Sequence, residues 1–222
     1  MKLPQSGRIS RLARRWSNAE LRKFAGWFTG DVVNVSAWRD EDKCGAHYAD
    51  YFTQKSSYTI TNYKPDARGL QGAPNERFLD LEAPLDQDLA GRFDVVFNHT
   101  VLEHVYEFQA AFANLCTMSR DIVIVVLPWL QPYHGDYGDY WRFSPLAARR
   151  MFEANGLTAL YVSFNEDAFA SVYVFALGSR HPERWRARFP EPVTIENAAH
   201  RVAGQRSIVQ GVRSAWRVLR GR

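Results

Sequence analysis

The stretch that decides the fold is FDVVFNHTVLEHVYEFQAAFANLCTMSRDIVIVVLP, from Phe93 to Pro128. Residues 93–97 form a short apolar run, which is typical of a buried strand. Residues 122–127 read IVIVVL without a polar break, which predicts a central parallel strand covered on both faces. Residues 107–118 show helical periodicity between them. The whole stretch therefore predicts a strand–helix–strand unit.

The same alternation continues on both sides of this unit. Short apolar or β-branched runs predict further strands at residues 32–35, 58–61, 77–79, 159–164 and 171–177. Helical spacing predicts helices over residues 8–28 and 145–154, and Gly156 is a suitable residue to end the second. Strands that alternate with helices predict an α/β, doubly wound, mostly parallel seven-stranded sheet, and the last two strands predict a closing antiparallel pair.

The charges divide the chain into three expected segments: an N-terminal amphipathic helix (1–30), an α/β domain (31–178) and a basic helical extension (179–222). Residues 1–28 carry seven basic residues and one acidic residue, and residues 180–222 carry ten and three, whereas residues 29–179 carry eleven and twenty. Basic amphipathic ends suit an anionic membrane surface or a partner helix. They are equally well explained as solvated basic helix faces.

Composition excludes several classes of protein. The 222 residues are 46% hydrophobic and 23% charged, as in one ordinary globular domain. The sequence contains neither an apolar stretch of the roughly 20 residues that a membrane span needs nor an apolar signal-peptide core. Cys44 and Cys116 suggest neither a disulfide framework nor a zinc site, which favours a reducing cytoplasm. The acidic middle segment makes nucleic acid an unlikely partner, because it repels a polyanion.

Polar residues follow five of the predicted strands. In open α/β sheets, ligands bind beyond the carboxyl ends of the strands, where the strand order switches. This rule selects residues 36–38, 62–64, 80–81, 98–100 and 128–142. Polar residues also often do no more than end a strand, so these places predict one site only if the expected topology holds.

Two motifs resemble a known family. Residues 93–128, with the LEHV turn at 102–105, look like the second half of a class I S-adenosylmethionine-dependent methyltransferase domain. Residues 134–157, HGDYGDYWRFSPLAARRMFEANGL, resemble a type 11-like subset, many of whose members act in surface-glycan or lipid-linked sugar pathways. The resemblance extends from roughly residue 31 to residue 177. It implies S-adenosyl-L-methionine (SAM) as cofactor and methyl transfer to a small or glycan-type hydroxylated acceptor.

The first strand departs from the family pattern. The family usually has an acidic residue there, followed by a Gly-x-Gly turn whose backbone amides approach the methionine part of the cofactor. Here Asn34 replaces the acid, and the turn reads Ser36-Ala37-Trp38-Arg39 without a glycine. In one interpretation, Ser36 and Ala37 shape a wider turn that still binds SAM. In the other, the domain has lost the cofactor and serves as a scaffold or partner-binding protein in a biosynthetic assembly.

The resemblance implies further cofactor-binding residues at later strand ends. Asn62 matches the position of an acid that accepts hydrogen bonds from the ribose hydroxyls. Asp80 fits the position that often contacts the adenine amino group, and Leu81 is placed to pack on the ring. Asn98 and His99 follow the fourth strand and complete the expected pocket, with His99 near the methyl-transfer point; His99 is alternatively a packed strand-end residue.

A histidine base suits methyl transfer to a sugar hydroxyl, because the ordinary pKa of histidine lies near neutrality. We expect His134 to be this base, Asp139 to orient it or to contact a hydroxyl, and Arg142 to pair with a phosphate or carboxylate of the acceptor. His134 is alternatively an ordinary loop histidine, and Arg142 alternatively pairs with Asp139.

Two other histidine assignments are weaker. His104, beside Glu103, is expected to support its turn rather than to catalyse. A metal site from His134, Asp136 and Asp139 has a spacing that is too irregular, so the sequence predicts no metal.

Overall fold

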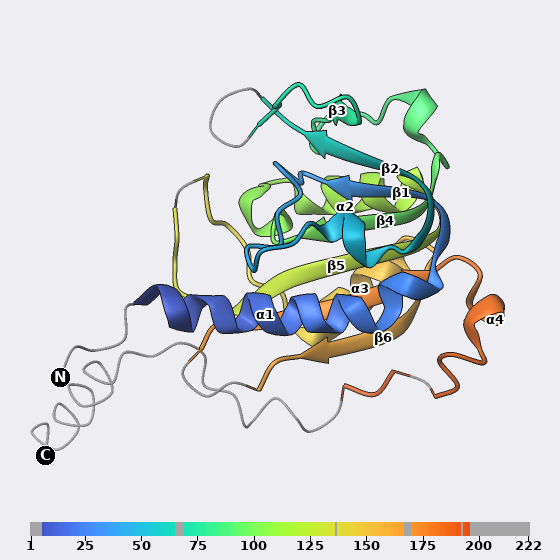
Figure 1. The fold of residues 1–222 in the computed structure, drawn as a ribbon. Helices are drawn as coiled ribbons and strands as arrows, with labels where there is room; N and C mark the ends of the chain where they lie inside the picture. The colour runs from blue at the N-terminus through green and yellow to red at the C-terminus, as the bar shows by residue number, and fades with distance from the viewer. Residues whose placement is uncertain (1–5, 65–68, 136, 167–169, 192, 196–222) are drawn as a thin grey trace, which may run out of the picture.

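The chain forms one seven-stranded α/β sheet with helices on both faces (Figure 1). The structure is a computed structural model that describes residues 6–64, 69–135, 137–166, 170–191 and 193–195. The strands are β1 (Thr29–Val35), β2 (Gln54–Asn62), β3 (Glu76–Phe78), β4 (Phe93–His99), β5 (Ser119–Leu130), β6 (Thr158–Phe164) and β7 (Val172–Ser179). The helices are α1 (Ser6–Phe24), α2 (Phe108–Met118), α3 (Pro145–Ala154) and α4 (Pro182–Trp185), with short 3-10 helices η1 (Ala25–Trp27), η2 (Tyr48–Tyr51), η3 (Gln87–Leu89) and η4 (Leu102–His104).

The strand order is β3-β2-β1-β4-β5-β7-β6, with β7 antiparallel to both β5 and β6. The prediction of a doubly wound, mostly parallel seven-stranded sheet with a final antiparallel pair is therefore confirmed. Each predicted strand overlaps an observed one, and most observed strands extend further at one or both ends.

Residues 122–127 of β5 are all apolar because both faces of this strand are covered. Because side chains alternate across a strand, its successive residues serve opposite faces of the sheet. Ile122, Ile124 and Val126 pack in the core on the α1 side. Val123, Val125 and Leu127 pack in the core on the α2 and α3 side. Both cores are fully buried at β5, so a polar residue at any of these positions would lie in apolar surroundings.

Helix α1 lies across one face of the sheet, with its N-terminal half near the carboxyl ends of the parallel strands (Figure 1). Ala13, Leu21 and Phe24 are buried in the core on this face. The helix begins at Ser6 and ends at Phe24, and η1 replaces the last predicted turn. This path brings the middle of α1 to the edge of the sheet where the sequence predicts a site.

The basic C-terminal extension falls mostly outside the described residues. Most of the predicted basic helical extension (179–222) lies in residues 196–222, which are not described. Within the described part of this extension, the four-residue α4 is the only α-helix. Within the described part of the chain, we find no helix both long and apolar enough to cross a membrane. The three segment boundaries drawn from the sequence stay predictions.

We expect Gly178→Ala to destabilise the fold. A Cβ atom at Gly178 would lie 2.5 Å from Cδ1 of Phe152, which is fully buried where α3 packs on β7. Overpacking of this kind costs about 1–3 kcal/mol. Urea unfolding measures the loss, and Gly26→Ala is the control, since its new Cβ would meet only the Thr53 hydroxyl at 3.3 Å. Equal stability of the two variants would contradict this packing.

Candidate active site

The strand order switches between β1 and β4, where the chain continues to opposite sides of the sheet. Val35 and Asn98 are paired at the carboxyl ends of these two strands, and the Asn98 side-chain amide donates a hydrogen bond to the Val35 carbonyl at 3.0 Å. A crevice at such a switch point is the usual place for a ligand in this class of sheet. The loops after β1, β2, β4 and β5 therefore define the candidate site.

The turn after β1 has two residues with positive φ angles, a conformation that favours glycine, although neither residue is a glycine. Ser36 and Trp38 have φ angles of +56° and +53°, in the left-handed region, and Ala37 lies between them. Their spacing is that of the Gly-x-Gly turn that the family resemblance leads us to expect. The Ala37 amide donates to the Thr61 carbonyl at 3.0 Å, and the Ser36 amide to the Thr61 hydroxyl at 3.2 Å. The end of β2 thus holds the turn in place.

Asn62 closes a second connection to this turn. Its side-chain oxygen accepts from the Trp38 amide at 2.6 Å, and its side-chain nitrogen donates to the Trp38 carbonyl at 3.0 Å and to Glu76 at 2.5 Å. Asn62 is buried, so a ribose hydroxyl would have to compete with these bonds. The guanidinium carbon of Arg39 lies 5.1 Å from the centre of the Trp38 ring, which is half-buried.

The Asn34 side chain has a structural partner. Its amide nitrogen donates to the Asp40 carboxylate at 2.7 Å. Asp40 also accepts from the Tyr58 hydroxyl at 2.6 Å and the Ala49 amide at 2.8 Å. An acid at position 34 would place a second carboxylate against Asp40, and like charges at this distance repel. An amide at position 34 is therefore favoured, because the loop after β1 already supplies a carboxylate, that of Asp40.

The remaining predicted cofactor residues lie at the ends of β3 and β4. Asp80 is half-buried, and its carboxylate accepts from the Glu82 amide at 3.0 Å. Leu81 is buried, and its carbonyl accepts from Asn114 at 3.0 Å. Asn98 is fully buried, and among the described residues its side-chain oxygen has no hydrogen-bond partner.

Arg14 of α1 enters the site beside His99, a contact that the sequence did not reveal. Its guanidinium lies 2.9 Å from His99 Nδ1 and donates to the Thr100 hydroxyl at 3.0 Å and the Tyr48 hydroxyl at 3.2 Å. Thr100 has a φ of +51°. Within the described residues no carboxylate forms an ion pair with Arg14, so neutral groups hold this charge.

The bonds around His99 fix its tautomer. A guanidinium only donates, so Nδ1 of His99 must accept from Arg14. The Ser17 hydroxyl donates to the Arg14 carbonyl at 3.0 Å, which leaves its oxygen to accept from His99 Nε2 at 2.9 Å. Burial, and then the charges of Arg14 and Lys43, hold the pKa of His99 well below its ordinary value. Both nitrogens of the neutral ring are therefore engaged.

A second group of residues lies in the loop after β5. The guanidinium of Arg142 donates two hydrogen bonds to Asp139, at 2.5 and 2.7 Å, and the Asp139 side chain is fully buried. These bonds lower the pKa of Asp139 to about 2. Asp139 also accepts from the His134 amide at 2.8 Å, and its Oδ2 lies 3.3 Å from His134 Nδ1. The structure thus brings the three predicted catalytic residues together and pairs Arg142 with Asp139.

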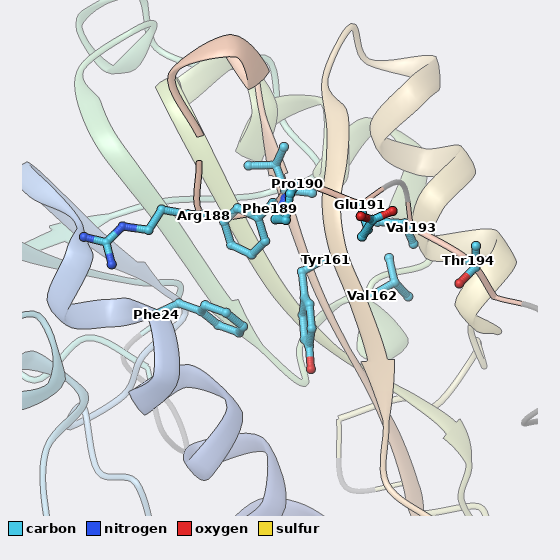
Figure 2. Close-up of a pocket in the computed structure, with 10 residues that line it drawn as sticks. Phe24, Tyr161, Val162, Arg188, Phe189, Pro190, Glu191, Val193 and Thr194 are labelled. Atoms are coloured by element: carbon cyan, nitrogen blue, oxygen red, sulfur yellow. The ribbon is translucent and has the colours of Figure 1, made fainter. Parts of the chain in front are cut away.

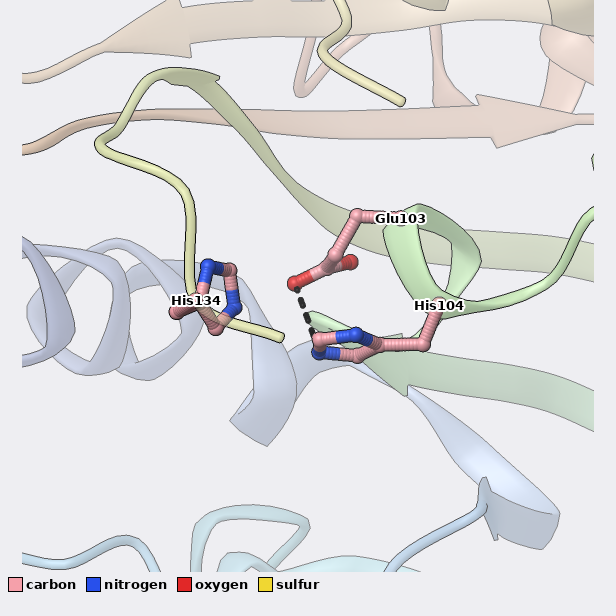
Figure 3. A group of neighbouring side chains, drawn as sticks. All are labelled: Glu103, His104 and His134. Atoms are coloured by element: carbon pink, nitrogen blue, oxygen red, sulfur yellow. Dashed lines mark ion pairs between the residues drawn. The ribbon is translucent and has the colours of Figure 1, made fainter. Parts of the chain in front are cut away.

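Glu103 and His104 of η4 lie beside His134 (Figure 3). Glu103 is buried, which raises the pKa of its carboxyl to about 8. Its Oε1 lies 3.7 Å from His104 Nε2, and the His104 and His134 ring centres are 5.0 Å apart. Asp136 lies outside the described residues. Sequence reasoning treated Glu103 and His104 as turn residues because an acid beside a histidine gives no sign of burial.

A cavity of about 360 Å³ lies elsewhere, along β6 (Figure 2). Phe24, Tyr161 and Phe189 provide its aromatic lining. None of the predicted site residues lines it, so we assign the candidate site from the switch point and not from this cavity.

Two solved methyltransferases resemble the chain. The magnesium protoporphyrin IX methyltransferase of Synechocystis PCC 6803, with bound SAM, matches with a TM-score of 0.53 and 13% identity over 81% of this chain and 86% of that one. The 1,6-didemethyltoxoflavin-N1-methyltransferase of Burkholderia thailandensis, with bound S-adenosylhomocysteine, matches with a TM-score of 0.53 and 15% identity over 79% and 81%.

We expect Ser36→Gly and Ala37→Gly to change stability in opposite directions. A left-handed residue other than glycine costs about 1–2 kcal/mol, which Ser36→Gly would relieve, whereas glycine costs about 0.5–1 kcal/mol in added chain entropy. Ala37 has no positive φ and would only lose. Urea unfolding of both variants measures the difference. A larger loss for Ser36→Gly than for Ala37→Gly would contradict the strained turn.

Acid should destabilise the fold through His99. Its ordinary pKa is 6.5, and the folded value lies well below, so the unfolded chain binds more protons once the pH falls below 6.5. The free energy of unfolding should then fall with pH by up to about 1.4 kcal/mol per unit. Urea unfolding between about pH 7 and pH 5 tests this, and His99→Gln should flatten the slope. An unchanged slope in that variant would refute the assignment.

The comparisons extend no further than solved structures. No model of a known protein family matches the sequence, and no curated protein matches it significantly. Identities this low show the fold alone. The chain therefore has the fold of the class I SAM-dependent methyltransferases.

Proposed function

We propose that this chain transfers a methyl group from SAM to a small hydroxylated acceptor at the switch point between β1 and β4. The observation that carries the proposal is the turn at Ser36–Trp38, whose positive φ angles favour glycine, beside the buried side-chain oxygen of Asn98, which has no hydrogen-bond partner among the described residues. Solved proteins of the same fold hold SAM or S-adenosylhomocysteine.

The residues present fit the functional groups of this cofactor. Ser36 and Ala37 would hold the methionine part, and Asp80 and Leu81 the adenine. Asn62 would hold the ribose in exchange for one of its bonds to Trp38 or Glu76. Asn98 offers a buried acceptor for a donor such as the cofactor ammonium group. Beside His99, the Arg14 guanidinium lacks an anionic partner among the described residues and suits the cofactor carboxylate.

The loop after β5 would serve the acceptor. When bound, SAM would supply an electrophilic methyl group for in-line attack by the acceptor hydroxyl, with the C–O bond formed as the C–S bond breaks. His134 would take the hydroxyl proton on Nε2 because its Nδ1 faces Asp139. Arg142 would keep Asp139 charged and fixed.

The acceptor we favour is a sugar. Tyr106, Tyr140 and Trp141 form an aromatic group next to this loop, with ring centres 5.4 Å apart for Tyr106 and Tyr140 and 6.3 Å apart for Tyr106 and Trp141. Tyr106 and Tyr140 are exposed. Exposed rings of this kind can pack against the apolar face of a sugar ring. If the sugar is lipid-linked, the basic ends of the chain would contact an anionic membrane. Liposome flotation with anionic lipids tests this contact.

Calorimetry with SAM and S-adenosylhomocysteine should separate binding from chemistry. Asp80→Ala should weaken binding about tenfold, because one polar contact contributes about 1–3 kcal/mol. His134→Ala should leave binding unchanged and slow turnover about 10²- to 10⁴-fold. Asp86→Ala, on the exposed part of the same loop, is the control. Equal effects of the first two variants on binding would overturn the division of roles, and absence of binding at millimolar ligand would favour a scaffold.

A further inference from the structure

Glu103, His104 and His134 form a cluster with the donor set of a metal site. Each offers one ligand atom, and these atoms lie within 4.8 Å of one another. The carboxylate and the two imidazole rings face one another from η4 and from the loop after β5 (Figure 3). The spacing of these residues along the chain gave no sign of this, since the two loops meet only because β4 and β5 are neighbours.

The bonds of His104 leave a lone pair aimed at Glu103. Its Nδ1 lies 2.5 Å from the Gly138 carbonyl, which only accepts, so Nδ1 carries the hydrogen. In the neutral ring, Nε2 is then an acceptor, and it faces the Oε1 carboxylate oxygen of Glu103 at 3.7 Å. The proton that Glu103 retains through its raised pKa, or a cation that displaces this proton, would stabilise two acceptors that face each other at this distance. A histidine that donates its second nitrogen to a backbone carbonyl is the usual arrangement of a metal ligand.

His134 has the corresponding support on its own side. Its Nδ1 lies 3.3 Å from the Asp139 carboxylate, which Arg142 holds with two hydrogen bonds. This carboxylate orients the ring and leaves Nε2 as the ligand atom. Both histidines therefore have a second partner of the kind that fixes metal-bound imidazoles.

Glu103 supplies an independent observation that points to a ligand. Its side chain is 1% exposed, and within the described residues Oε2 has no hydrogen-bond partner. A buried carboxylate oxygen without a partner is costly, at about 1–3 kcal/mol or more. A bound cation would satisfy it.

We propose that Glu103, His104 and His134 bind one divalent transition-metal ion. Two imidazoles and one carboxylate suit zinc, iron, cobalt or manganese better than magnesium or calcium, and three protein ligands leave positions open for a substrate oxygen. The role of the ion rests on the proposed function: it would hold the acceptor oxygen and lower the pKa of its hydroxyl. With Nε2 bound to the ion, His134 would be a ligand in place of the base described above, and the hydroxyl proton would leave to water.

Titration of the untagged 222-residue chain with CoCl₂ tests the site, because bound Co²⁺ has visible absorption bands. We expect saturable binding of one Co²⁺ per chain, displaced by ZnCl₂. His134→Ala removes a partly exposed ligand, and Glu103→Gln keeps the size of the side chain while it removes the charge. Each should weaken binding at least tenfold. His181→Ala, at the opposite edge of the sheet, should bind as the unaltered chain does.

Two results would overturn the site: absence of saturable Co²⁺ binding up to millimolar concentration, or equal affinity in the unaltered chain, Glu103→Gln and His134→Ala. Circular dichroism of each variant establishes that it is folded. Calorimetry with SAM, performed with and without ZnCl₂, keeps the two proposals apart. Metal binding without SAM binding would support the site and refute the methyltransferase, and the reverse would refute the site alone.

Discussion

The hydrogen bond from the Asn98 side chain to the Val35 carbonyl joins β4 to β1 at the point where the strand order switches. Beyond Val35 the chain continues toward β2, and beyond Asn98 it continues toward β5. The parallel register of β1 and β4 fixes the distance between the two loops that follow. A shift of this register by one residue would turn every side chain of a strand to the other face and separate the loops.

The turn after β1 shows how a glycine-type backbone is kept without glycine. Left-handed φ angles at Ser36 and Trp38 cost about 1–2 kcal/mol each. Bonds to Thr61 and Asn62 offset this cost, at about 1 kcal/mol net for each typical hydrogen bond. Thr61 and Asn62, at the end of β2, thus stabilise a backbone conformation that glycine adopts without steric cost. Ser36 and Trp38 nevertheless carry Cβ atoms on this turn, which glycines would lack.

The sequence was informative wherever one element decided the outcome. The apolar runs of β4 and β5 predicted central strands, because only apolar residues are stable between two covered faces. Periodicity predicted α2 and α3 to within a residue at each end. It did not predict that β7 lies between β5 and β6, since strand order depends on contacts between elements that no local pattern records.

The sequence predicted only part of the candidate site, because the site also depends on contacts between elements. The loop after β5 carries its own motif, so His134, Asp139 and Arg142 were found together. Arg14 was not, because it reaches His99 from 85 residues away and resembles the other basic residues of α1 in sequence. Glu103 was passed over because burial, which makes its carboxylate unusual, arises from packing alone.

Two ionisable groups lie near the end of β4: the half-buried guanidinium of Arg14 and the buried carboxyl of Glu103, whose pKa burial raises to about 8. Neutral groups surround the guanidinium of Arg14, and Oε2 of Glu103 has no hydrogen-bond partner in the part of the chain that the structure describes. The two attract each other through the protein, yet within the described residues they form no ion pair. Partly and fully buried charges are seldom left in this state. An anion against Arg14 and a cation against Glu103 would complete both, which is the charge pattern of a cofactor carboxylate on one side and a metal ion on the other.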